Sequence, residues 1–261
     1  MPAHDWLATG PTTWFAALAL APFAGSFLGV LVQRLPHSRP MVFARSHCDA
    51  CGTVLTLPDL IPLASFLWLR GRCRHCGASI SWFHPAIELA ALAVAGWAAM
   101  ANTAHLWLDC LLGWSLLTLA WIDWRCMRLP DLLVLPLLPA GLLFTLITDS
   151  DAIADHAAAA ALGYVSLRVL AWCYHVVRRR EGIGAGDAKL LAAAGAWLGT
   201  AWLPLLVFVA ALLGITAAAC QGLVGRRLKM DMALPFGPWL ALAFWLLWLH
   251  GDRLINSGGV S

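Results

Sequence analysis

The stretch WFAALALAPFAGSFLGVLV, residues 14–32, decides the fold class, because it has no charged side chain over a length that can cross a bilayer. A second uncharged stretch, WLPLLVFVAALLGITAAACQGLV, covers residues 202–224. A hydrocarbon core of about 30 Å takes about 20 apolar helical residues. A helix also satisfies its own backbone polar groups in that solvent. Both stretches therefore predict membrane-spanning helices.

The composition extends this prediction to the whole chain. Of the 261 residues, 61% are hydrophobic and 12% are charged, and the mean hydropathy is +0.76. This leaves too little polar surface to cover a soluble globule. We expect an all-α polytopic membrane protein with about eight spans, roughly 14–33, 86–102, 106–122, 132–148, 157–177, 188–200, 202–224 and 234–250, the sixth being short. The expected division is a first transmembrane segment (1–33), a cytoplasmic zinc-binding loop (34–84) and a transmembrane core (85–261).

Lysine and arginine predict the orientation, because short loops that carry them stay in the cytoplasm. If the N-terminus lies outside, the inward loops hold every Lys and Arg except Arg168 and Arg253. Both termini are then periplasmic or extracellular, and the net charge of +3 requires no nucleic acid as a partner. Arg168 falls within a span, so we expect it to face the bundle interior and meet a carboxylate or carbonyl that the sequence does not identify.

The loop after the first span carries two CxxC pairs. Cys48 and Cys51 are separated by 21 residues from Cys73 and Cys76, and a glycine follows each pair. Four thiolates at this spacing suit one tetrahedral ion, and the glycines permit tight turns around it. The alternative is two disulfides, which a reducing compartment disfavours. Because a four-cysteine site has no open coordination position, we expect a structural zinc that folds the loop.

Two aspartates lie at predicted span ends on the cytoplasmic side. Asp123 ends the third span, and Asp187 follows a glycine run that includes Gly184 and Gly186. Ionisable groups in such positions are costly unless they face a cavity and have a function, and glycines let another backbone approach the carboxylate. Paired carboxyls share one proton, so one takes a proton from water while the other polarises a peptide carbonyl. The alternative for Asp187 is a helix cap.

Three further charged residues have two interpretations each. Lys189 either tunes the aspartate pair or extends to the lipid headgroups. Glu88, one turn into the second span, either touches substrate or cofactor or pairs with an arginine such as Arg70 or Arg72. Asp131 either contributes to the site or, as we favour, caps the fourth span.

Two other functional classes fit the pattern less well. A membrane thiol oxidoreductase needs its paired cysteines at the outer face, whereas the basic flanks place these inside. A transporter that relays protons needs carboxylates near mid-membrane, whereas Asp123 and Asp187 lie at span ends.

The order of short segments along almost the whole chain resembles the type IV prepilin leader peptidases, membrane aspartyl proteases that also serve type II secretion. The matching segments are Gly25-Ser-Phe-Leu28, Arg34-Leu-Pro36, the double CxxC loop, Ile61-Pro-Leu63, Gly71-Arg-Cys73, Pro85-Ala-Ile-Glu88, Ile122-Asp123, Leu129-Pro-Asp131, Gly184-Ala-Gly186-Asp187-Ala-Lys189-Leu190 and Phe236-Gly-Pro238.

The resemblance implies that Asp123 and Asp187 are the catalytic pair, Asp187 being the aspartate of a GxGD motif, with Gly184, Gly186, Lys189 and Glu88 in supporting positions. It implies a bacterial inner-membrane enzyme that cuts the basic leader of prepilins or pseudopilins after a glycine at the cytoplasmic surface. Most members then methylate the new N-terminal residue with S-adenosylmethionine. The pilin served, the oligomeric state and the residues that bind the methyl donor are not indicated by the sequence.

Overall fold

The computed structural model describes residues 10–37, 46–179, 184–223 and 235–258, in which the regular elements are helices and two isolated β-bridges. The all-α prediction is therefore confirmed. The chain forms two compact units, Met1–Thr118 and Leu119–Ser261, and their boundary falls within helix α4 (Leu106–Cys126). The expected boundary between residues 84 and 85 stays a prediction.

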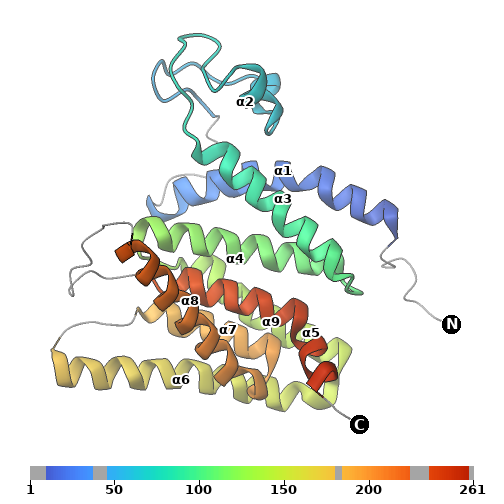
Figure 1. Ribbon diagram of the computed structural model, residues 1–261, viewed down its shortest axis with the longest axis vertical. Coiled ribbons are helices and arrows are strands. Elements are labelled where there is room, and N and C mark those ends of the chain that lie inside the picture. The colour runs from blue at the N-terminus through green and yellow to red at the C-terminus, as the bar shows by residue number, and fades with distance from the viewer. Residues whose placement is uncertain (1–9, 38–45, 180–183, 224–234, 259–261) are drawn as a thin grey trace. The chain divides into compact units, whose positions relative to one another are not determined.

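In the first unit, α1 (Pro11–Arg34) and α3 (Phe83–Ala101) lie side by side (Figure 1). A Cβ added at Gly25 of α1 would lie 2.6 Å from the Cα of Glu88 in α3, so the two backbones approach only because no side chain stands between them. The buried face of α3 continues with alanines from Ala91 onward. Small residues at an interface allow this close packing of membrane helices.

In the described part of the segment between α1 and α3, the helices are all short: η2 (Leu35–His37), η3 (Leu57–Leu60) and α2 (Ala64–Trp68). Residues 46–82 carry all four cysteines of the CxxC pairs and are called the CxxC loop below.

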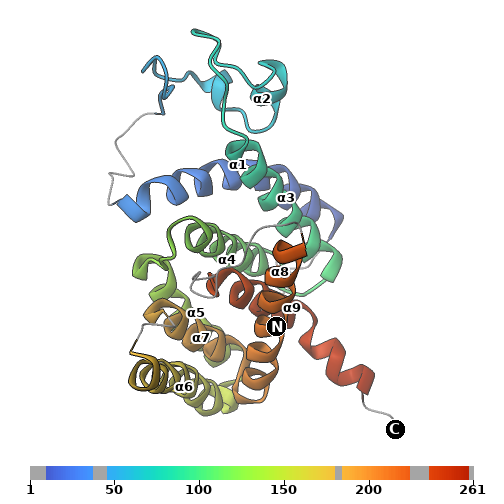
Figure 2. The same ribbon diagram turned by 60° about the vertical axis from the view of Figure 1, so that its left-hand side comes forward.

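The second unit is built around a helix that is buried on nearly all sides. Its long helices are α5 (Asp131–Thr148), α6 (Ile153–Arg178), α7 (Ala185–Leu198), α8 (Leu203–Leu223) and α9 (Gly237–Gly258). The central helix α7 packs against α5, α6 and α9, and its residues 190–197 are all buried (Figure 2). A Cβ at Gly195 would lie 2.6 Å from the Ala159 carbonyl carbon of α6, which explains their close approach.

All eight predicted spans correspond to helices. Among the described residues, six helical segments are long and apolar enough to cross a membrane: Pro11–His37, Phe83–Ala101, Leu106–Cys126, Asp131–Thr148, Ser150–Arg178 and Thr200–Gly222. The other two predicted spans correspond to α7 and α9. With 14 residues, α7 is short for a span, as its sequence indicated. The polytopic membrane fold is confirmed.

Arg168 overturns one expectation. The buried row of α6 contains Ala159, Gly163 and Leu167, whereas Arg168 is exposed. Successive residues of an α-helix are turned by about 100° from one another. Arg168 therefore points away from the face on which its neighbour Leu167 packs, and the prediction that it faces the bundle interior is wrong.

The described basic residues at helix ends agree with the expected orientation. Arg34, Arg125 and Arg178 each lie in the last turn of α1, α4 and α6, the ends predicted to be cytoplasmic. The orientation was also predicted from basic residues that lie outside the described part of the chain. These are Arg39, Arg45, Arg180, Arg226, Arg227 and Lys229. The orientation stays a prediction.

Candidate active site and metal site

The two CxxC pairs lie on turns of the same geometry. In each, the N–H of the first cysteine, Cys48 or Cys73, donates to the carbonyl five residues later, and the glycine N–H donates back to that cysteine's carbonyl, at 2.8–2.9 Å. Gly52 and Gly77 have φ angles of +70° and +72°. Glycine adopts this left-handed conformation without strain, so the expected tight turns are confirmed.

The two turns bring four sulfur atoms together. The Sγ atoms of Cys48, Cys51, Cys73 and Cys76 all lie within 4.8 Å of one another, and those of Cys48 and Cys76 are 3.9 Å apart. Zinc–sulfur bonds of about 2.3 Å in a tetrahedron place sulfurs about 3.8 Å apart. All four side chains are free thiols, so the alternative of two disulfides is not formed. The cluster fits one tetrahedral metal ion.

Thr53 is a partner of the cluster that the sequence analysis missed. The Cys51 thiol contacts the Thr53 hydroxyl at 3.3 Å. Hydrogen bonding with the side chain and backbone of Thr53 lowers the pKa of Cys51 to about 6, toward the thiolate form that binds metals. At Cys76 the Ala78 N–H lowers the pKa, but burial and the neighbouring thiols raise it overall to about 11. The position of Thr53, two residues after the first pair, was the available signal.

The second unit brings Asp123 and Asp187 together from different helices. Asp123 lies near the end of α4 and Asp187 in the first turn of α7, and their exposed fractions are 6% and 8%. The two carboxyls are close enough to interact electrostatically. The N-cap of α7 is Gly184, and the Asp187 carboxyl, three residues further on, accepts its backbone N–H. Asp187 thus caps the start of this helix, as one interpretation expected, and also lies beside Asp123.

Gly237 is a second residue that the sequence analysis did not include in the site. Its backbone N–H donates to Asp123 Oδ2 at 3.1 Å, in a buried position at the start of α9. A Cβ at Gly237 would lie 2.7 Å from the same oxygen, closer than any real side chain permits. Only glycine lets this amide reach the carboxylate. The available signal was the segment Phe236-Gly-Pro238.

Leu129 packs against the glycines beside both aspartates. A Cβ at Gly186 would lie 2.8 Å from Leu129 Cβ, and one at Gly237 would lie 3.3 Å from Leu129 Cδ1. Leu129 belongs to the turn between α4 and α5. It therefore places an apolar side chain next to Asp123 and Asp187.

Lys189 forms an ion pair at the start of two helices. Its Nζ lies 2.6 Å from Asp131 Oδ1, which joins α7 to α5. Neither interpretation of Lys189 anticipated this partner. The N-cap of α5 is Pro130, so Asp131 does not cap it.

In the first unit, Glu88 is 7% exposed, and its carboxylate accepts the Leu63 N–H at 2.8 Å and the Ser26 hydroxyl. Both partners are neutral donors, not the expected Arg70 or Arg72.

Sequence comparisons match both units of the chain to known protein families. Residues 19–102 match the bacterial peptidase A24 N-terminal domain, and residues 110–219 match the type IV leader peptidase family. A protein of Aeromonas hydrophila is 38% identical over 88% of each chain. One of Dickeya chrysanthemi is 38% identical over 90% of this chain and 92% of its own. A third, of Pseudomonas aeruginosa, is 35% identical over 98% and 97%.

All three relatives are named prepilin leader peptidase/N-methyltransferase. No solved structure matches the chain. Because the similarity covers most of each chain and includes the segments that carry the thiol cluster and the aspartate pair, this chain belongs to the type IV leader peptidase family.

Proposed function

We propose that this chain cleaves the leader peptide of prepilins or type II secretion pseudopilins and then N-methylates the new N-terminal residue. The observation that carries the peptidase half is the burial of Asp123 and Asp187 on separate helices, close enough to interact, with a backbone amide donating to each of them. The names of relatives that match over most of their length support both halves.

Asp123 and Asp187 carry out the hydrolysis as a pair that shares one proton. Each carboxyl accepts a backbone N–H, Asp123 from the buried Gly237 and Asp187 from Gly184. In this proposal Asp123 is the base and Asp187 is the acid. Asp123 takes a proton from water, whose oxygen adds to the peptide carbonyl carbon while Asp187 donates a hydrogen bond to the carbonyl oxygen. The C–N bond then breaks, and the leaving amine takes up a proton from the pair, without a covalent intermediate.

The CxxC loop holds a structural zinc in this proposal. Cys48, Cys51, Cys73 and Cys76 provide the tetrahedral set of thiolates, which leaves no position for a substrate. S-adenosylmethionine would supply the methyl group: its S–CH3 bond would break as the new N-terminal amine forms the N–CH3 bond and loses a proton, and S-adenosylhomocysteine would leave.

We place the enzyme in the bacterial inner membrane with both termini in the periplasm. The basic ends of α1, α4 and α6 then lie in the cytoplasm, as the bias against translocated arginine requires. Asp123 shares its end of α4 with Arg125. The aspartate pair thus meets its substrate at the cytoplasmic surface.

The test uses the purified full chain, a pilin-like substrate with a glycine–phenylalanine junction, and labelled S-adenosylmethionine. Cleavage and methyl incorporation are scored separately. We expect both. No cleavage by a folded, metal-loaded protein would contradict the peptidase assignment, and cleavage without label would limit the chain to proteolysis.

A further inference from the structure

One side of the CxxC loop exposes large apolar side chains that neither the thiol cluster nor the aspartate pair uses. Leu67 and Trp82 are 74% and 76% exposed, and both line a groove of about 380 Å³ beside α2, called the α2 groove below. Trp68, the next residue of α2, is 86% exposed. Exposed apolar side chains gathered in this way indicate an interaction surface.

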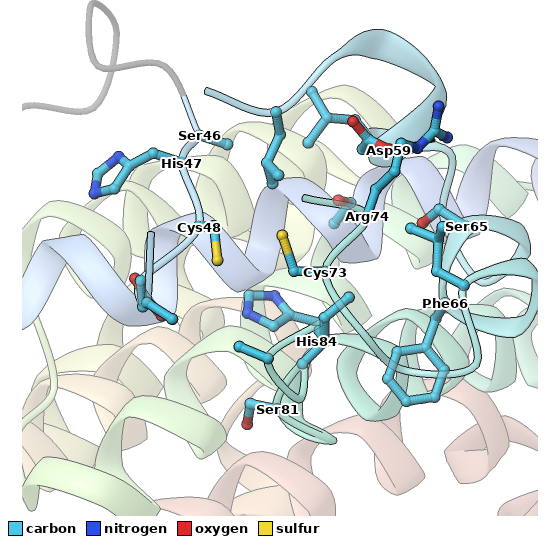
Figure 3. A pocket seen from close by; sticks show the side chains of 18 of the residues that line it. Ser46, His47, Cys48, Asp59, Ser65, Phe66, Cys73, Arg74, Ser81 and His84 are labelled. Atoms are coloured by element: carbon cyan, nitrogen blue, oxygen red, sulfur yellow. Dashed lines mark ion pairs between the residues drawn. The ribbon is translucent and has the colours of Figure 1, made fainter. Parts of the chain in front are cut away.

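Two arginines line the same groove. Arg70 and Arg72 are exposed, and neither has an acidic partner within the described part of the chain. Arg74 differs, because it pairs with Asp59 at 3.1 Å, and Figure 3 shows these two side chains next to each other. A guanidinium group suits a phosphate oxyanion in both charge and shape. The α2 groove therefore combines apolar surface with two positive charges.

The α2 groove lies at the beginning of a membrane-spanning helix. Trp82 is the N-cap of α3, and its ring contacts that of Phe66 in α2, with the ring centroids 5.0 Å apart. The N-cap of α2, Leu63, donates its N–H to Glu88 of α3 at 2.8 Å. Figures 1 and 2 both show α2 next to the start of α3.

These contacts set the depth of α2 relative to the bilayer. The 19 residues of α3 cover about 28 Å, close to the thickness of the hydrocarbon core, so α3 begins near the hydrocarbon boundary. Glu88 lies five residues after Phe83, the first residue of α3, which is about 7.5 Å along the helix. A helix anchored at that depth lies level with the lipid headgroups, where tryptophan and arginine side chains are favoured.

We propose that the α2 groove docks on the bilayer and binds the headgroup of an anionic phospholipid. Leu67, Trp68 and Trp82 enter the interfacial layer, and Arg70 and Arg72 contact the phosphate. Apolar and basic side chains together are typical of segments that lie on a membrane surface. The inference goes beyond the proposed function and uses none of the residues assigned to cleavage or to the metal.

The test identifies the molecules that touch the groove. The metal-loaded full chain, with the photoreactive residue benzoylphenylalanine in place of Leu67, is placed in nanodiscs made of phosphatidylcholine and phosphatidylglycerol. Mass spectrometry identifies the adducts formed on irradiation. We expect lipid adducts in which phosphatidylglycerol exceeds its share of the mixture about fivefold, the effect of one arginine at an anionic surface.

Two further variants separate charge from apolar contact. Arg70→Gln combined with Arg72→Gln should keep the lipid adducts but abolish the excess of phosphatidylglycerol. Leu57 provides the matched control, since it is an 84% exposed leucine of the same loop that does not line the groove, and benzoylphenylalanine there should give no such excess. Metal content shows whether each variant keeps its folded loop. If the double variant loses its metal, high salt replaces it, because salt screens exposed charges and should reduce the excess.

Absence of lipid adducts from position 67 would overturn the docking. Lipid adducts without an excess of phosphatidylglycerol, or with an equal excess from position 57, would contradict the headgroup site. Adducts with an added pilin-like substrate in place of lipid would assign the groove to the substrate instead. Cleavage and methylation are scored separately, so each of these results leaves the proposed function in place.

Discussion

The CxxC loop and the aspartate pair are assembled in opposite ways. The four thiols converge through two short turns within residues 48–76, and Cys51 and Cys76 are exposed. The two carboxyls are buried and come from α4 and α7, with the Gly237 amide of α9 as a third contributor. The loop also leaves large side chains such as Trp68 and Trp82 exposed, so it has little apolar core of its own.

This difference in assembly predicts how mutations damage each site. A loop with little buried apolar surface depends on its metal ion for folding, so removing a ligand should damage it. The aspartate pair depends on helix packing, so a small steric change at a helix contact should misplace a carboxylate without loss of the fold.

The largest effect on leader cleavage is expected from replacing either aspartate. We expect Asp123→Asn and Asp187→Asn each to lower the kcat of leader cleavage by about a thousandfold or more, because one carboxyl cannot act as both acid and base. Asp187→Asn should still methylate a pre-cut peptide, since no bond needs hydrolysis. Near-normal cleavage by either variant would remove that residue from the catalytic pair, and equal loss of methylation would mean that the two activities are not separable.

The next effect tests the packing at Gly237. We expect Gly237→Ala to lower kcat about a hundredfold with a smaller change in KM, because its Cβ would lie 2.7 Å from Asp123 Oδ2 and displace the carboxylate. Gly96→Ala is the control, since the nearest atom to its added Cβ is 3.8 Å away. Cleavage kinetics of both variants, with helix content by circular dichroism, decide the matter. Normal kcat in Gly237→Ala would show that the amide does not position Asp123.

The third effect concerns the metal. We expect about one zinc per chain in the wild type and its loss in Cys51→Ser, with methylation impaired at least as much as cleavage. Thr53→Val should keep the metal but lower its affinity by about tenfold, measured against a competing chelator, because a partner of Cys51 is removed. If the cysteines react with alkylating agents only after reduction, the loop carries disulfides. The predicted cytoplasmic position of the loop would then also be wrong, because disulfides seldom persist in a reducing compartment.

The smallest effect is expected at the ion pair between α5 and α7. Lys189 and Asp131 keep 29% and 56% of their side chains exposed, and pairs this exposed contribute about 0–1 kcal/mol. We expect Lys189→Gln to change kcat and thermal stability only slightly, and to match Asp131→Asn. A large loss of kcat in Lys189→Gln alone would mean that Lys189 acts on the aspartate pair directly.

The sequence by itself determined the spans, the four thiols and the two aspartates. Spans follow from apolar length, since the bilayer imposes that length on any chain. The thiol cluster follows from local spacing, because a CxxC turn with its glycine closes within a few residues.

Only the tertiary structure decided which groups meet across helices. Four features depend on how each helix is rotated about its axis and how closely it packs. They are the exposure of Arg168, the neutral partners of Glu88, the Lys189–Asp131 pair and the approach of Gly237 to Asp123. Mean hydropathy and residue spacing do not show how a helix is rotated about its axis. A glycine has no side chain from which a contact could be predicted. The hydrogen bond from the Gly237 amide at the start of α9 to Asp123 of α4 is therefore known only from the tertiary structure.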